Sequence, residues 1–218
     1  MNNKTTIANI YQKFGIPPNL QEHMMRVCGI VNFIESHWKG AQDVNWSLAK
    51  KVALLHDLGN VVKFDLDRNP EFLGEEQANV DYWKRVQKEV IEKYGSDDHE
   101  ATKKMLEEIG ISKEAIEIIL NKSFGNSVET KNSDDWILKT VYYADLRTLP
   151  FGIGTLEERI ADVRNRMPKY TARPDFEDLV SACREIENQL QQNVDIPLSN
   201  ISNDSVTFDN KTMLEIEI

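Results

Sequence analysis

The chain has 218 residues, 36 of them acidic and 26 basic, and its formal net charge is −10. This acidic balance argues against a general binder of nucleic acid polymers, because a protein that neutralises a phosphate backbone is normally basic. It leaves room for a small phosphorylated ligand that is held by a metal. The length is sufficient for one domain with a sizeable core.

Cys28 and Cys183 stand far apart, and both fall on predicted apolar helix faces. Two such cysteines make no disulfide framework and are typical of a reduced compartment. No window approaches the length of apolar sequence that spans a bilayer. We therefore expect a cytoplasmic protein with no membrane partner.

Helical periodicity is strong and strand signals are scarce, so the sequence predicts an all-α fold. We expect one helical domain over residues 1–192 and a tail over 193–218, either disordered or forming one short strand. The irregular run 61–73 is predicted to be a loop over a site. The predicted helices cover about 6–14, 19–38, 48–58, 75–94, 98–109, 112–120, 133–145, 155–166 and 174–192.

The most informative stretch is Ala53-Leu-Leu-His-Asp-Leu-Gly59. It is typical of the last turn of an apolar helix, with Gly59 at the position of a left-handed cap. The pair His56-Asp57 is then predicted to lie at a buried helix end. A buried charge without a partner is costly, so this pair must be hydrogen-bonded, paired with a cation or coordinated to a metal.

Two further ionisable residues are predicted on inward helix faces. His23 lies within an apolar stripe, and Asp145 follows Leu138, Val141 and Tyr142 at helical spacing. Taken alone, a buried histidine is more often a hydrogen-bonded core residue, and a carboxylate near a helix end is more often solvated or paired with an arginine. Taken together with His56 and Asp57, they form a mixed nitrogen and oxygen set that suits Mn, Fe, Co, Ni, Zn or Mg.

The pattern His23, His56-Asp57 within Leu54–Gly59, and Asp145 within Tyr143-Ala144-Asp145 resembles the HD superfamily of metal-dependent phosphohydrolases. The motifs span about residues 20–150. The resemblance implies that these four side chains are metal ligands. It also implies an HD-domain helical bundle with a motif core at about 19–150 and additional C-terminal helices at 155–192. The implied activity is cleavage of a phosphate ester or anhydride of a small substrate, with a nucleotide (5′-nucleotidase-like activity) as the first expectation.

Members of this superfamily that hold two metals usually add two histidines between the His-Asp pair and the last aspartate. His99 fits the first of these positions, whereas Asn121-Lys122-Ser123 stands where the second is expected. We therefore expect one divalent metal ion. His99 is then expected to face the substrate or support the site, and the competing interpretation is a solvated residue in the first turn of a helix.

Under this interpretation, Asp57 orients a metal-bound water or takes its proton. Lys63, Arg68 and Arg147 are candidate substrate-binding cations for the phosphate oxygens, and Lys63, Arg147 and His99 are also assigned to catalysis. The competing interpretation of the three cations is ordinary surface charge.

Three other classes of protein stay open. The first is a non-catalytic, metal-stabilised HD domain that binds a nucleotide as a sensor. The second is an iron-dependent oxygenase with two irons, against which the missing second histidine counts. The third is a helical interaction protein, which leaves Asp145 unexplained. The sequence also leaves open whether the protein forms a homodimer.

Overall fold

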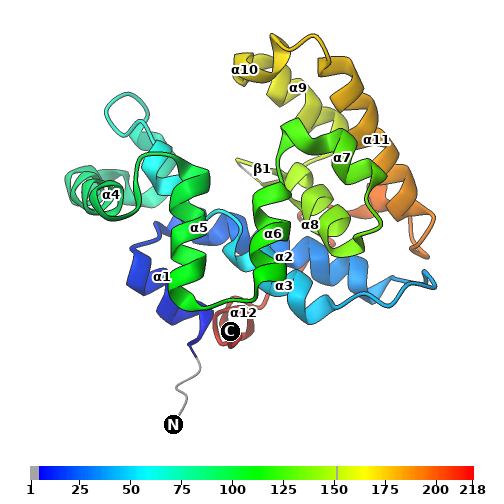
Figure 1. The fold of residues 1–218 in the computed structure, drawn as a ribbon, viewed down its shortest axis with the longest axis horizontal. Helices are drawn as coiled ribbons and strands as arrows, with labels where there is room; N and C mark the ends of the chain where they lie inside the picture. The colour runs from blue at the N-terminus through cyan, green and yellow to red at the C-terminus, as the bar shows by residue number, and fades with distance from the viewer. Residues whose placement is uncertain (1–4, 151) are drawn as a thin grey trace. The chain divides into compact units, whose positions relative to one another are not determined.

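The computed structural model describes residues 5–150 and 152–218, and it confirms the predicted all-α class (Figure 1). The α-helices are α1 (Ile7–Phe14), α2 (Pro18–Ser36), α3 (Trp46–Leu55), α4 (Val80–Tyr94), α5 (Asp98–Ile109), α6 (Lys113–Asn121), α7 (Ser127–Asn132), α8 (Trp136–Arg147), α9 (Leu156–Arg166), α10 (Pro168–Thr171), α11 (Phe176–Gln191) and α12 (Asn210–Leu214). The 3-10 helices are η1 (Leu58–Lys63), η2 (Pro70–Asn79), η3 (Phe124–Asn126) and η4 (Leu198–Asn200).

A short antiparallel pair joins β1 (Thr148–Leu149) to β2 (Gly152–Ile153), with Thr148 opposite Ile153. Within the residues that the structure describes, no helix is both long enough and apolar enough to cross a membrane. The described chain divides into two compact units. The first contains the described residues up to Met25, then Leu54–Leu120 and Asp209–Ile218, and the second contains Arg26–Ala53 and the described part of Asn121–Phe208.

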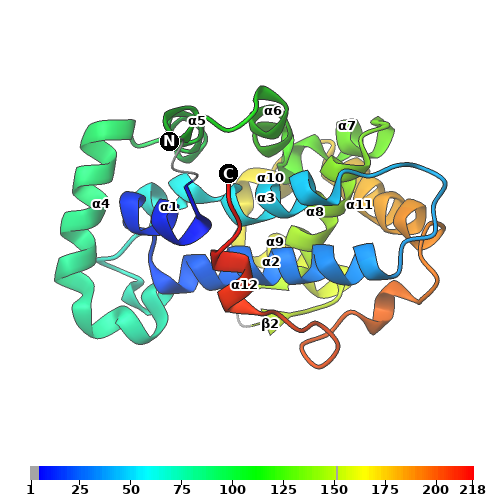
Figure 2. The same ribbon diagram turned by 90° about the horizontal axis from the view of Figure 1, so that it is seen from below.

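In the first unit, the two ends of the chain pair with each other. Thr6 forms an antiparallel bridge with Glu217, and the amide of Ile7 donates to the carbonyl of Ile216 at 3.0 Å. Helix α12, drawn in red near the C-terminus in Figure 2, also packs against α1. The tail was expected to be disordered or to form a short strand, but residues 193–218 instead include η4 and α12.

The closest packing in the first unit joins η1 to α5. A Cβ on Gly59 would lie 2.5 Å from the carbonyl oxygen of Asp98 and 2.6 Å from the amide nitrogen of Thr102. Gly59 was predicted to be a left-handed cap, but α3 already ends at Leu55 and the φ angle of Gly59 is not positive. The glycine is therefore required by the close approach of α5, and its own amide donates to Oγ1 of Thr102 at 3.0 Å.

The helix predicted over 75–94 begins only at Val80, because residues 70–79 form η2 with Gly74 at φ +59°. Leu66, Leu73 and Trp83 form a buried cluster here. The run 61–73, predicted to be a loop, is thus partly 3-10 helix that packs on α4.

In the second unit, α11 packs against α7 and α8, and α8 packs against α9 (Figure 1). Helix α9 begins with the capping box that Thr155 and Glu158 predict. Helix α8, predicted to begin at 133, begins at Trp136, because the carboxylate of Asp135 accepts from the amides of Ile137 and Leu138 and caps the helix there.

Candidate metal centre

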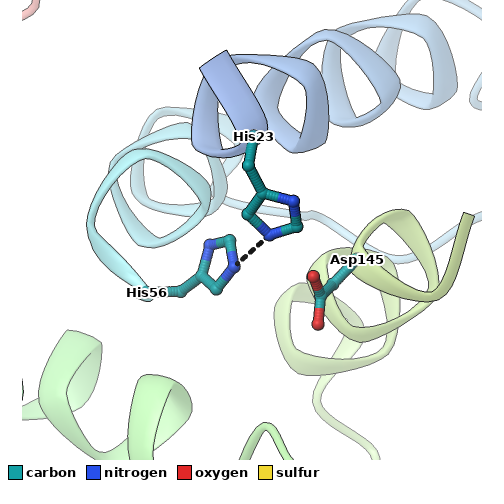
Figure 3. A group of neighbouring side chains, drawn as sticks. All are labelled: His23, His56 and Asp145. Carbon is teal, nitrogen blue, oxygen red and sulfur yellow. Dashed lines mark hydrogen bonds between the residues drawn. The ribbon is translucent and has the colours of Figure 1, made fainter. Parts of the chain in front are cut away.

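Two imidazoles and one carboxylate of the first unit converge on a small volume. Nε2 of His23 lies 3.3 Å from Nε2 of His56 (Figure 3). Oδ2 of Asp57 lies 3.6 Å from Nε2 of His23, and Oδ1 of Asp57 lies 3.4 Å from Nε2 of His56. The side chain of His56 is fully buried, while those of His23 and Asp57 are 24% and 19% exposed.

The end of α3 explains how His56 and Asp57 reach this position. Leu54 and Leu55 anchor the last turn of α3 in the core. The hydroxyl of Tyr11 donates to the carbonyl of Leu54 at 2.7 Å, which satisfies one of the carbonyls that a helix end leaves without an intrahelical partner. The chain therefore leaves the helix directly after Leu55 without leaving that buried carbonyl unpaired.

Asn60 holds the carboxylate of Asp57. Its side-chain amide donates to Oδ2 of Asp57, and its backbone amide donates to the carbonyl of Asp57 at 3.0 Å. Both contacts lie within the first turn of η1. The side chain of Asp57 is therefore fixed by the same turn that begins η1.

The separations of these donor atoms match those around a metal ion. A tetrahedral metal with ligands at about 2.0–2.1 Å keeps its donor atoms about 3.3–3.4 Å apart. The two ring nitrogens are 3.3 Å apart, and each faces a different oxygen of Asp57, with Oδ1 at 3.4 Å from His56 and Oδ2 at 3.6 Å from His23. Two ring nitrogens and a carboxylate oxygen are also chemically suited to divalent transition metals.

Asp145 is the fourth residue that the sequence singled out. It lies on α8 in the second unit, and its side chain is 19% exposed. The contacts among His23, His56 and Asp57, all in the first unit, support the predicted metal.

Lys122 is a charged residue near a candidate ligand that sequence reasoning missed. It directly follows α6, and its Nζ donates to Oδ2 of Asp145 at 2.6 Å. The side chain of Lys122 is only 8% exposed. The sequence did carry a signal, because this lysine is in the segment where a second metal-binding histidine was expected.

Lys63 ends η1, whereas Asp98 and His99 begin α5. Nζ of Lys63 donates to Oδ2 of Asp98 at 2.7 Å, and His99 is exposed. Burial of Asp98 raises the pKa of its carboxyl, but the hydrogen bond and charge of Lys63 outweigh this effect, so the pKa lies below its usual value. Lys63 keeps a half-exposed ammonium.

The two arginines differ from the expectation. Arg68 is 85% exposed and lies 3.8 Å from Asp65 of its own segment, which fits the interpretation as surface charge.

Arg147, by contrast, is buried inside the second unit. Its guanidinium donates to the hydroxyl of Tyr143 at 2.6 Å and to the carbonyls of Leu198 and Ile201 at 3.0 and 2.7 Å, and it also donates to the carbonyl of Gly154. These partners engage all three guanidinium nitrogens. We therefore replace the expected catalytic and phosphate-binding roles of Arg147 with a structural one.

In comparisons with protein-family models, with curated proteins and with solved structures, nothing matches this chain. The resemblance to the HD superfamily therefore rests on the motif residues alone. The features that bear on function are the contacts and ligand chemistry of His23, His56 and Asp57.

Proposed function

We propose that the protein is a metal-dependent phosphohydrolase that cleaves a phosphate ester or anhydride of a small substrate. A nucleotide is the substrate class to test first. The observation that carries the proposal is the convergence of His23, His56 and Asp57: the two Nε2 atoms are 3.3 Å apart, and each lies 3.4–3.6 Å from one carboxylate oxygen of Asp57.

Under this proposal, His23, His56, Asp57 and Asp145 would hold one divalent cation. The choice lies among Mn, Co, Ni, Fe, Mg and Zn. Two neutral imidazoles and two carboxylates carry a total charge of −2, and the ammonium of Lys122 beside Asp145 offsets part of it, so these ligands hold too little negative charge for two divalent ions. This balance favours one ion over two for these four ligands.

Such an ion, when bound, lowers the pKa of a bound water and polarises a phosphoryl oxygen. Asp57 is suited to orient that water or to accept its proton at a carboxylate oxygen, because Asn60 fixes the carboxylate. Lys63 would bind phosphate oxygens through its half-exposed ammonium. His99, exposed beside Asp98, would contact the remainder of the substrate.

The test is to reload metal-free protein with each of the six metals and to screen nucleoside mono-, di- and triphosphates and general phosphoesters for phosphate release. We expect metal-dependent turnover that His56→Ala and the isosteric Asp57→Asn both abolish. His37→Ala is the matched control, because His37 pairs with Asp195 at 3.0 Å on a different part of the chain. Full metal-dependent turnover in Asp57→Asn would refute the assignment.

Two other outcomes would replace the proposal. Binding of metal and nucleotide without phosphate release would identify the protein as a sensor. Two irons per chain with oxygen consumption would identify it as an oxygenase.

A further inference from the structure

The second unit contains a close ion pair whose lysine has no role in the proposed function. Nζ of Lys122 donates to Oδ2 of Asp145 at 2.6 Å, and the two side chains are 8% and 19% exposed. Lysine is seldom so well buried unless it is paired. A charge-assisted hydrogen bond of this length is stronger than one between neutral groups and is weakly screened at this depth.

The position of this ammonium matters because Asp145 is a proposed metal ligand. A carboxylate has two oxygens, so Asp145 can ligate a metal through one oxygen while Oδ2 receives the hydrogen bond from Lys122. A divalent ion on Asp145 would then lie a few ångströms from a fixed positive charge. Because like charges repel, Lys122 opposes the binding of the metal as long as no anion is present.

We propose that Lys122 couples metal binding to the binding of a phosphate group. A phosphate that enters the site brings negative charge to the metal and to the ammonium together, which removes the repulsion between them. Metal and phosphate then strengthen each other's binding through Lys122. This inference rests on the proposed function, and the ligand chemistry that it specifies is a phosphate group with two negative charges.

The competing explanation is that Lys122 merely neutralises Asp145 within the fold. Both explanations predict that Lys122→Met changes stability. Only the coupling predicts that the influence of phosphate on metal affinity depends on Lys122. A binding measurement therefore distinguishes them.

The experiment measures the affinity of the full chain for Mn²⁺ from the loss of the free Mn²⁺ resonance signal, with and without inorganic phosphate. We expect phosphate to tighten Mn²⁺ binding by about tenfold in the unmodified protein, which is within the usual range of coupling between two bound ligands. In Lys122→Met, we expect Mn²⁺ to bind more tightly without phosphate, and phosphate to change its affinity less than about threefold.

Two further variants act as controls. Lys122→Arg keeps the positive charge and should retain most of the coupling. Lys50→Met removes a partner of a comparable ion pair in the same unit, since Nζ of Lys50 lies 2.6 Å from Glu35, and it should behave like the unmodified protein. Circular dichroism and thermal melting report whether each variant folds.

The proposal is overturned if Lys122→Met keeps the coupling of the unmodified protein, or if the unmodified protein shows no coupling. If Lys122→Met does not fold, loss of coupling in Lys122→Arg would overturn it as well. Failure of the proposed metal site has a different signature, because Mn²⁺ would then not bind or would bind equally well to His56→Ala.

Discussion

Two buried polar clusters in this protein are built in opposite ways. In the second unit, the guanidinium of Arg147 donates to three backbone carbonyls and to the Tyr143 hydroxyl. In the first unit, two imidazoles turn their Nε2 atoms toward each other and toward the carboxylate of Asp57. A donor surrounded by acceptors is what a fold needs to satisfy a buried charge, whereas ring nitrogens and carboxylate oxygens brought together are the ligand atoms of divalent transition metals.

The partners of a buried polar group therefore distinguish a structural role from a functional one. Arg147 donates to the carbonyls of Gly154, Leu198 and Ile201. These hydrogen bonds connect helix α8 to other segments of the second unit and stabilise their packing. The His23, His56 and Asp57 cluster instead brings three possible ligands to metal-like separations. A substitution of Arg147 should therefore lower the stability of the fold, whereas a substitution in the His23, His56 and Asp57 cluster should lower the affinity for metal.

The largest effect is expected for Asp57→Asn. The amide keeps the shape of the side chain but loses the negative charge, so metal affinity should fall by more than the about 10–100-fold typical of a group that only supports a ligand. Metal content after equilibrium dialysis measures this, with unfolding in urea as the control. An unchanged metal content would remove the contrast between the two clusters.

Arg147→Met comes next. Removal of a buried guanidinium leaves several carbonyls and the Tyr143 hydroxyl without their donor, and the free energy of unfolding should fall by about 3 kcal/mol or more. Denaturant unfolding gives the value, and metal content per folded chain should not change. A stable Arg147→Met protein that no longer binds metal would show that this arginine serves the site after all.

Asn60→Ala should have a smaller effect. Its side-chain amide donates to Oδ2 of Asp57, so the carboxylate would lose its orientation but not its charge. We expect metal affinity to fall by about tenfold with little change in stability. Isothermal titration with Mn²⁺ tests this, and Asn79→Ala, which removes an exposed hydrogen bond to Glu76, is the matched control.

The smallest effect on stability is expected for an exposed cluster of charges around Glu108, which differs from both of the buried clusters. Hydrogen bonds from Lys13, Tyr94 and Lys93 lower the pKa of Glu108 from 4.5 to about 2. Because the pKa is lower in the folded chain, the stabilisation is complete above about pH 4.5 and is lost as the pH falls toward 2. Solvent screens this cluster, so Glu108→Gln should lower stability at pH 7 by less than about 1 kcal/mol, measured by unfolding across this pH range.

The fold was largely predictable because helical periodicity and caps are local properties of the sequence. The capping box of Thr155 and Glu158 is an example, and it occurs as predicted. The predictions failed where backbone conformation depends on distant partners. Gly59 was assigned to a cap by its position after an apolar run, yet its role depends on the approach of α5, which is 43 residues away at Thr102.

The site shows the same division. The inward positions of His23, His56 and Asp145 follow from periodicity, and the structure buries or half-buries each of these side chains. The role of Arg147 could not be read in this way, because closeness in sequence to Asp145 says nothing about the carbonyls that surround its side chain.

The sequence by itself determined that this protein is built of helices and that its ionisable residues at 23, 56, 57 and 145 have inward or helix-end positions. Those properties depend on spacing along a single helix. Only the tertiary structure decided which charged groups become partners, as it did for Lys122 with Asp145 and for Lys63 with Asp98. The physical reason is that a hydrogen bond depends on distances of a few ångströms between helices, and no local pattern encodes those distances.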